Sequence, residues 1–255
     1  MVTINTRKWM RRLSAGMCGS LLLATAAQAE PVEPLQLYAT GVAQNAARVM
    51  QLQFAEGTRK GWEYGPQFVQ TGGTDKRVVS LVQEGAAADI IIVQTSEMEG
   101  LKAAGLVRPE TVKPLGRVHI AVGVKPGAPR PDISTYEKFR DALLAAGAVT
   151  YSDPTSGSAG GMLIHSILDK PEFANLKREH RPGSDAPIML QPVGQMRGNT
   201  GVDEVGLVPD SLNAYLEFSI AVGKNAKHPD AALAFQNYAL QPQFASVWTQ
   251  WGVAR

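Results

Sequence analysis

Short apolar runs alternate with amphipathic stretches along this chain, and this alternation constrains its fold more than any other feature. The clearest run, Asp89 to Val93 (DIIIV), is typical of a strand that is buried on both faces of a sheet. Gly85 and Gly105 end the helices that we predict before and after it. The alternation continues to a last helix that opens at Pro229. It predicts an α/β fold with mainly parallel sheets.

The individual elements follow from periodicity and from helix start and stop signals. Ser134 and Glu137 have the spacing of a capping box, which predicts the start of one helix. Strands are predicted at residues 35–39, 67–71, 89–93, 117–124, 148–151, 205–208 and 218–222, and helices at 45–56, 74–84, 97–104, 134–144, 162–168 and from 229 onward.

Residues 1–29 have the pattern of a cleaved secretion signal. Four basic residues precede an apolar stretch from Leu13 to Ala26, and Ala27-Gln28-Ala29 has the form of a signal-peptidase site. The mature chain would then begin at Glu30, and its expected location is the periplasm. Because the one cysteine, Cys18, lies within the signal, the mature protein would contain no disulfide and no thiolate ligand.

The charge of the mature chain gives no sign of a nucleic-acid partner. The full sequence has 25 basic and 23 acidic residues, but the four basic residues of the signal leave 21 against 23. A net charge of −2 is not the footprint of a protein that binds polyphosphates. The four histidines, at 119, 165, 180 and 228, lack the spacing of metal ligands, so we expect no metal and no cofactor.

One loop has the composition of an anion site. The predicted strand 148–151 leads into SDPTSGSAGG, residues 152–161, which delivers hydroxyls and small residues to the start of a helix. Free backbone N–H groups at a helix start bind anions, and small residues allow a ligand to approach them. Ser156, Gly157 and Ser158 are therefore candidate ligand-binding residues, although Ser and Thr at such positions also serve as ordinary helix caps.

Several segments in order resemble the periplasmic solute-binding proteins of the molybdate-binding type, which are receptors of ABC importers. The resemblance rests on Leu37 to Val42 (LYATGV), Gly85 to Ile92 (GAAADIII), Tyr151 to Pro154 (YSDP) and Lys227 to Ala232 (KHPDAA), followed by Gln241-Pro242 and Gly252. It implies a two-lobed type II binding fold with a small anionic ligand in a cleft between the lobes. The implied lobes are residues 30–117 with 220–255, and residues 118–219.

The resemblance also implies where the ligand contacts lie. The first loop would contribute Thr40 and Gly41, and the second loop Gly73 and Thr74, while Arg197 and Asp210 would come from later segments. Molybdate binders usually have serines in the first two loops and a tyrosine near Pro209, and this chain has other residues there. The implied ligand is therefore an organic carboxylate or a molybdate-like oxyanion. The implied partner is an inner-membrane permease, with the receptor itself a monomer.

The same resemblance extends to periplasmic enzymes that isomerise a tricarboxylic acid (aconitate isomerase), which share this fold. Such a reaction moves a proton along a three-carbon unit and needs an acid and a base. Asp210, His165 and Asp75 are the candidate catalytic residues, with Arg197 as an electrostatic partner. No spacing in the sequence marks any of them as catalytic, so both interpretations remain: a binding protein, or an isomerase.

Overall fold

The computed structural model describes residues 33–59, 68–180 and 184–255. The predicted secretion signal, residues 1–29, lies outside this part of the chain. Among the residues that the structure describes, no helix is long and apolar enough to cross a membrane.

The strands form one connected sheet in the order β2-β1-β3-β9-β4-β7-β5-β6, with β8 and β10 also paired to β4. Parallel pairs join β1 to β2 and β3, and β5 to β6 and β7, whereas β4 and β9 pair antiparallel with their neighbours. The strands are β1 Leu35–Thr40, β2 Phe68–Gly73, β3 Ile90–Gln94, β4 Lys113–Val124, β5 Ala148–Thr150, β6 Lys177–Glu179, β7 Ile188–Pro192, β8 Asp203–Leu207, β9 Tyr215–Val222 and β10 Val253–Ala254.

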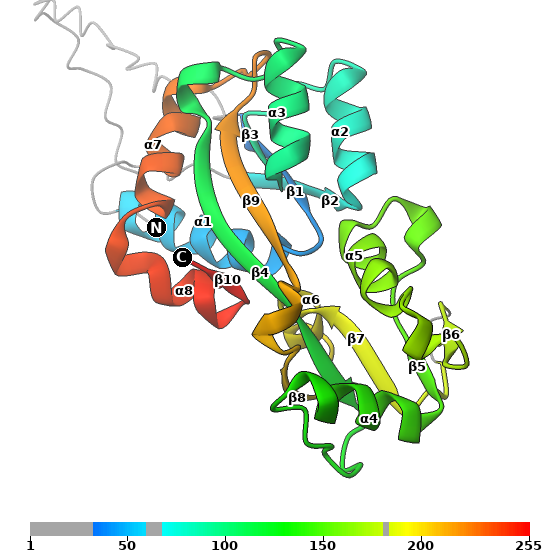
Figure 1. Cartoon of the computed structure of the whole chain (residues 1–255). Helices are drawn as coiled ribbons and strands as arrows, with labels where there is room; N and C mark the ends of the chain where they lie inside the picture. The colour runs from blue at the N-terminus through cyan, green and yellow to red at the C-terminus, as the bar shows by residue number, and fades with distance from the viewer. Residues whose placement is uncertain (1–32, 60–67, 181–183) are drawn as a thin grey trace, which may run out of the picture. The chain divides into compact units, whose positions relative to one another are not determined.

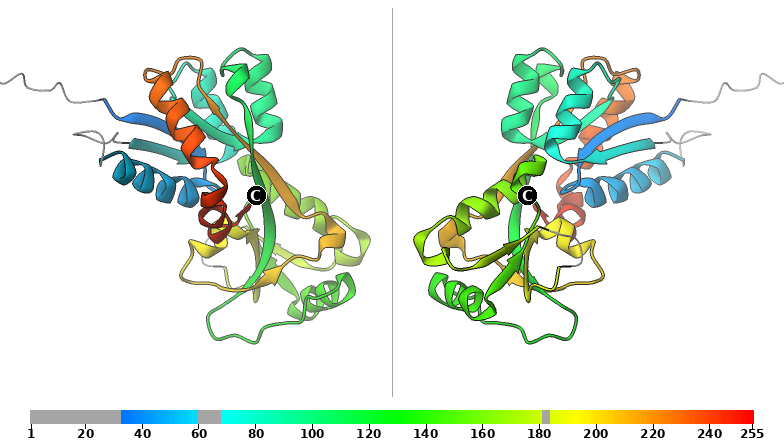
Figure 2. Two further views of the ribbon diagram at one scale, coloured as in Figure 1. Left: turned by 90° about the vertical axis from the view of Figure 1, so that its left-hand side faces the viewer. Right: turned by 90° about the vertical axis from the view of Figure 1, so that its right-hand side faces the viewer.

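Two lobes arise because β4 takes part in both halves of the sheet. Its first part, Lys113 to His119, pairs with β9, and its second part, Ile120 to Val124, pairs with β7. Figure 2 shows β4 and β9 running from one half of the sheet to the other. We call the half with β1, β2 and β3 the first lobe, and the half with β5, β6 and β7 the second lobe. The lobe boundaries given above stay predictions.

Each lobe has its own apolar core. In the first lobe, α1, α7 and α8 cover one face of the sheet with Met50, Phe235 and Trp248, and α2 and α3 cover the other with Val78 and Met98. In Figure 1, α7 lies on the opposite side of β4 and β9 from α2 and α3. The second lobe packs around Phe139, among other residues. The helices are α1 Gln44–Arg59, α2 Asp75–Gln83, α3 Thr95–Ala103, α4 Tyr136–Ala146, α5 Ala159–Leu168, α6 Val193–Arg197, α7 Pro229–Ala239 and α8 Ala245–Gln250.

Most predicted elements are confirmed, with shifts at their ends. The triple isoleucine run forms β3 and is fully buried, and Gly85, Gly105 and Gly147 have positive φ after their helices. The cap of α4 is Thr135 and not Ser134, since the Thr135 hydroxyl accepts the N–H of Lys138. The sequence analysis did not identify β6, β7, α6, α8 or β10, which are each only two to six residues long.

Candidate functional site

The loops that the sequence analysis singled out follow the carboxyl ends of parallel strands in both lobes. Thr40, Gly73 and Gln94 end β1, β2 and β3, and the loop from Ser152 follows β5. In open α/β sheets, ligands bind outside these strand ends, where helix N-termini also lie. The two loop sets meet at Lys76 and Gly157: a Cβ built on Gly157 would lie 2.7 Å from Lys76 Cβ.

A pocket of about 440 Å³ lies at this meeting point. Its walls come from α2, the start of α3, and the loop and first turns of α5. Charged Lys76, Asp75 and Glu97 share it with the apolar side chain of Met162, which is 50% exposed. The other lining residues are Val79, Ser80, Gln83, Gln94, Pro154, Thr155, Gly157 and Ala159.

The α2 helix presents its N-terminus to this pocket. Thr74 is the cap, and its hydroxyl accepts the N–H of Arg77 at 3.3 Å. Arg77 occupies the space beside Gly73 that a larger residue's side chain would need, because a Cβ on Gly73 would lie 3.1 Å from Arg77 Cδ. The aliphatic part of Arg77 thus packs over Gly73. Thr74 is therefore a helix cap, which is the alternative to ligand binding that the sequence analysis gave for Ser and Thr at a helix start.

The α5 helix begins on the opposite wall with Ser158 as its cap. The Ser158 hydroxyl accepts the N–H of Gly161 at 3.2 Å. Asp153 organises the preceding turn: its Oδ1 accepts both the N–H and the hydroxyl of Thr155, and its carbonyl accepts the Ser156 hydroxyl at 2.6 Å. These bonds hold the loop in one conformation, so the backbone N–H groups at the start of α5 face a fixed direction.

Asp75, the first residue of α2, is the buried charge of this site. It is only 5% exposed, and among the described residues its Oδ1 has no hydrogen-bond partner. Burial raises the pKa of Asp75, backbone N–H groups of Gln94 and Ala159 lower it, and Glu97 raises it. Because Ala159 opens α5, the carboxyl group of Asp75 lies between the starts of two helices from different lobes.

The first loop adds a second unsatisfied polar atom. Thr40 is 0% exposed, and its Oγ1 has no hydrogen-bond partner within the described part of the chain. Gly41 follows, and its N–H donates to the carbonyl of Gly73 at 2.8 Å, which ties the first loop to the second. Gln195 of α6 also reaches this loop, with Nε2 3.4 Å from the Cβ position of Gly41. The sequence analysis missed Gln195, since nothing distinguishes it within a five-residue helix.

Arg197 does not reach the pocket, because its guanidinium is fully engaged elsewhere. Its Nε and Nη2 bind Glu204, and its Nη1 donates to the carbonyls of Thr249 and Gln250 at the end of α8. It lines a smaller pocket together with His119 and Gly252. We therefore leave Arg197 out of the proposed ligand contacts.

His165 and Asp210 also lie apart from Asp75. The Nδ1 atom of His165 is 3.0 Å from the Tyr151 hydroxyl, and Tyr151 packs edge-on against His180 with ring centroids 4.5 Å apart. Asp210 is exposed in a short 3-10 helix between β8 and β9. Of the three candidate catalytic residues, Asp75 is the one that lines the pocket between the lobes.

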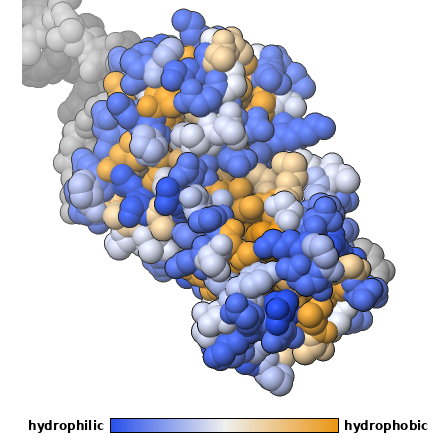
Figure 3. Space-filling view, viewed as in Figure 1, coloured by the Kyte–Doolittle hydropathy of each residue, from blue (hydrophilic) through white to orange (hydrophobic). Residues whose placement is uncertain are grey.

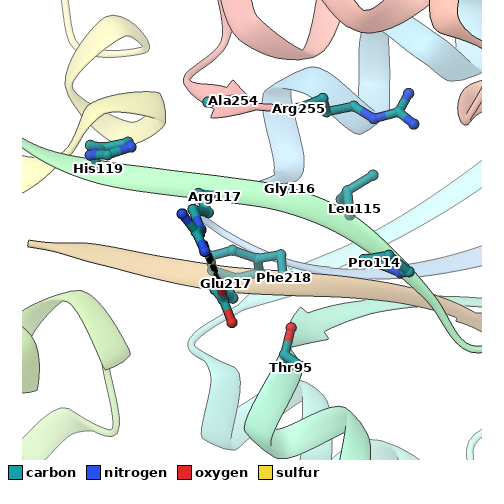
Figure 4. A pocket seen from close by; sticks show the side chains of 10 residues that line it. All are labelled: Thr95, Pro114, Leu115, Gly116, Arg117, His119, Glu217, Phe218, Ala254 and Arg255. Atoms are coloured by element: carbon teal, nitrogen blue, oxygen red, sulfur yellow. Dashed lines mark hydrogen bonds and ion pairs between the residues drawn. The ribbon is translucent and has the colours of Figure 1, made fainter. Parts of the chain in front are cut away.

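A larger pocket, of about 690 Å³, lies over β4 and β9 and reaches β10 (Figure 4). Its main charges are already paired: Arg117 binds Glu217 at 3.0 Å and stacks 4.5 Å from the ring centre of Tyr215. Figure 4 shows Arg117 and Glu217 pointing toward each other below β4, with Ala254 and Arg255 above it. This groove holds one helix start, Thr95 of α3, whereas the starts of α2 and α5, from different lobes, meet at the smaller pocket.

Comparisons with known proteins agree with this architecture. The chain is 27% identical over 240 residues to an aconitate isomerase of a Pseudomonas species, covering 89% of this chain and 90% of that protein. The periplasmic molybdate-binding protein of Azotobacter vinelandii superposes with a TM-score of 0.68 at 14% identity, over 87% of this chain and 99% of that one. A sulfate-binding protein of Mycobacterium tuberculosis has a TM-score of 0.66 at 19% identity, over 86% of each chain.

At these identities the structural matches show the fold alone, which is that of the two-lobed binding proteins. The family model described as bacterial extracellular solute-binding protein matches residues 35–197 and 183–254, which is nearly all of the part that the structure describes. The chain therefore belongs to the bacterial extracellular solute-binding proteins.

Proposed function

We propose that this protein is a periplasmic receptor that binds a small organic anion between its lobes and presents it to an ABC permease. The observation that carries the proposal is the meeting of the α2 and α5 N-termini at one pocket, with Lys76 on one wall and Gly157 on the other. Helix N-termini supply N–H donors and a favourable potential for an anion. Export through the signal at residues 1–29 belongs to this proposal.

The lining supports a carboxylate more than a bare oxyanion. Lys76 offers a cationic side chain beside the helix starts, while Met162 and Val79 offer apolar contacts. Figure 3 shows hydrophobic residues at the surface where the lobes join, bordered by hydrophilic ones. A carbon skeleton that bears carboxylates uses both kinds of contact, whereas a tetrahedral oxyanion uses only the polar ones.

Thermal unfolding of the chain from Glu30 onward tests this proposal. Citrate, trans-aconitate, molybdate, tungstate and sulfate are each added in turn, and a ligand at 100 times its Kd stabilises by about 2.7 kcal/mol. We expect stabilisation by at least one carboxylate, weakened in Lys76→Ala and retained in the exposed control Lys224→Ala. Stabilisation by molybdate or tungstate alone would contradict the carboxylate assignment, and no stabilisation by any of them would contradict the receptor.

A second candidate function is the isomerisation of a tricarboxylic acid. Two observations favour it: the 27% identical relative is an aconitate isomerase, and Asp75 is a buried carboxyl group in the pocket. A base would take a proton from one carbon of a three-carbon unit, the double bond would shift, and an acid would return a proton at the far carbon. Asp75 is the candidate for this proton transfer.

Proton NMR of the protein mixed with trans-aconitate separates the two functions. Growth of cis-aconitate signals would establish the isomerase, and broadened substrate lines without conversion would support the receptor. If there is turnover, we expect Asp75→Asn to abolish it, with His165→Gln and Asp210→Asn as comparisons because both residues lie outside the pocket.

A further inference from the structure

We propose that Asp75 sets the ligand class, because its carboxylate accepts a hydrogen bond from a hydroxyl group of the bound anion. The site would then select hydroxycarboxylates over anions that carry no O–H donor. This inference rests on the proposed receptor function and names the ligand class of that site.

The first step of the argument is the unsatisfied acceptor. Asp75 is 5% exposed and lines the pocket, and Oδ1 has no hydrogen-bond partner among the described residues. A buried acceptor without a donor costs free energy, which a bound group with an O–H would recover.

The second step is the sign of the charge. Most of an anion site is made of donors, but Asp75 and Glu97 are acceptors that line the same pocket as Lys76. Burial raises the pKa of Asp75, whereas the backbone N–H groups of Gln94 and Ala159, at the starts of α3 and α5, favour its ionised form. A ligand without a proton would place its lone pairs against this carboxylate, whereas a hydroxyl turns the contact into a charge-assisted hydrogen bond.

The third step concerns the rest of the ligand. The carboxylates of a hydroxy acid would take the donors that remain, which are the N–H groups at the start of α5 and the side chain of Lys76. Discrimination of this kind is strong, because the analogue that lacks the hydroxyl leaves a buried polar group unpaired. Sulfate and molybdate carry no O–H at neutral pH and should be rejected for the same reason.

Calorimetry with two matched pairs of probes at pH 7 tests the inference. Citrate and tricarballylate differ by one hydroxyl, and hydrogen phosphate and sulfate are tetrahedral dianions of which only hydrogen phosphate carries an O–H. We expect the wild-type protein to bind citrate at least about 10-fold more tightly than tricarballylate. Hydrogen phosphate should likewise bind more tightly than sulfate. In Asp75→Ala the citrate-to-tricarballylate ratio should fall to about 1, since both the acceptor and its charge are removed.

Two further variants keep the test decisive. Glu97→Ala removes a carboxylate from the same pocket and should leave the ratio unchanged; if it alone abolishes the preference, Asp75 is not the acceptor. Asp75→Asn nearly preserves the shape should the alanine variant fail to fold, and it should lower the ratio at least threefold because the acceptor loses its charge. A wild-type ratio near 1, or an unchanged ratio in both Asp75 variants, would overturn the inference while the receptor function stands.

The remaining outcomes concern the two proposed functions. If no probe binds the wild-type protein, the receptor proposal fails, and the inference fails with it. If trans-aconitate is turned over and Asp75→Asn abolishes the turnover, the inference is overturned, because Oδ1 would then face a C–H group and take its proton.

Discussion

Arg197 donates hydrogen bonds to Glu204 from two guanidinium nitrogens, Nε at 2.8 Å and Nη2 at 3.1 Å. Its third nitrogen, Nη1, binds the end of α8. Nη1 donates to the carbonyls of Thr249 and Gln250 at 3.0 and 3.1 Å. A residue of the second lobe thereby satisfies carbonyl groups that a helix end leaves without partners. The planar fork makes this possible, because each nitrogen points at a different acceptor.

This arrangement predicts that Arg197→Ala lowers the free energy of unfolding by about 1–2 kcal/mol, a figure reduced for the partial exposure of the pair. Arg197→Lys should recover little of the loss, because an ammonium group cannot bind both partners in this geometry. Urea denaturation measures the effect. Arg117→Ala is the control, since the Arg117–Glu217 pair is more than half exposed and should change stability by at most about 1 kcal/mol. Equal losses in both alanine variants would contradict the prediction.

Replacing either of two helical glycines with alanine should change stability, and in opposite directions. In Gly161→Ala the new Cβ would lie 2.5 Å from the carbonyl oxygen of Ser152, which is backbone and cannot move freely. We expect a stability loss of about 1–3 kcal/mol from this overpacking and weaker ligand binding, because the loop before α5 must shift. In Gly100→Ala the new methyl group meets nothing within 4 Å, so helix propensity should raise stability by about 0.5–1 kcal/mol. Thermal unfolding with and without citrate reports both effects.

The cap of α5 should matter for both stability and binding. Ser158→Ala removes the hydroxyl that accepts the Gly161 N–H and should cost about 1 kcal/mol. It should also weaken ligand binding, since the helix start at the pocket becomes less ordered. Thr135→Ala is the matched control: it removes the cap of α4, which does not line the pocket, and should cost a similar amount without changing affinity. Equal affinity in the two variants would argue against a ligand at α5.

The free energy of unfolding should decrease as the pH rises, because Asp75 is buried. Burial raises its pKa above the ordinary value of 3.8, so the folded protein holds this proton more tightly than the unfolded chain. The resulting penalty is absent below the unfolded pKa, grows as the pH rises through the interval up to the folded pKa, and is constant above it.

Asp75→Asn removes this titration. Without ligand, the variant should therefore be more stable than the wild type at pH 7, by about 1.4 kcal/mol for each unit by which the pKa is raised, and equal to it near pH 3. Urea denaturation at pH 3, 5 and 7 measures the difference. Asp169→Asn, at an exposed carboxyl group, should show no such trend. A variant that is less stable at pH 7 would mean that the helix N–H groups outweigh burial.

Local signals in the sequence determined most helices and the buried strand β3. These features depend on residues a few positions apart: an apolar run, a glycine with positive φ, or a hydroxyl three residues before an N–H. The small residues at 157–161 likewise marked one wall of the pocket before any fold was known. The strand–helix alternation was enough to predict the α/β class.

Only the tertiary structure decided which of these residues act together. Arg197 was expected at the ligand, but Glu204 and the end of α8 take its donors, and those partners lie 7 and about 50 residues away in sequence. Asp75 was one of three candidate acid–base residues in the sequence, and what distinguishes it is the start of α5, 84 residues later in the chain, which lies against its carboxyl group. Local propensity acts within one helix or turn, whereas burial and pairing of a charge depend on what long-range packing brings beside it.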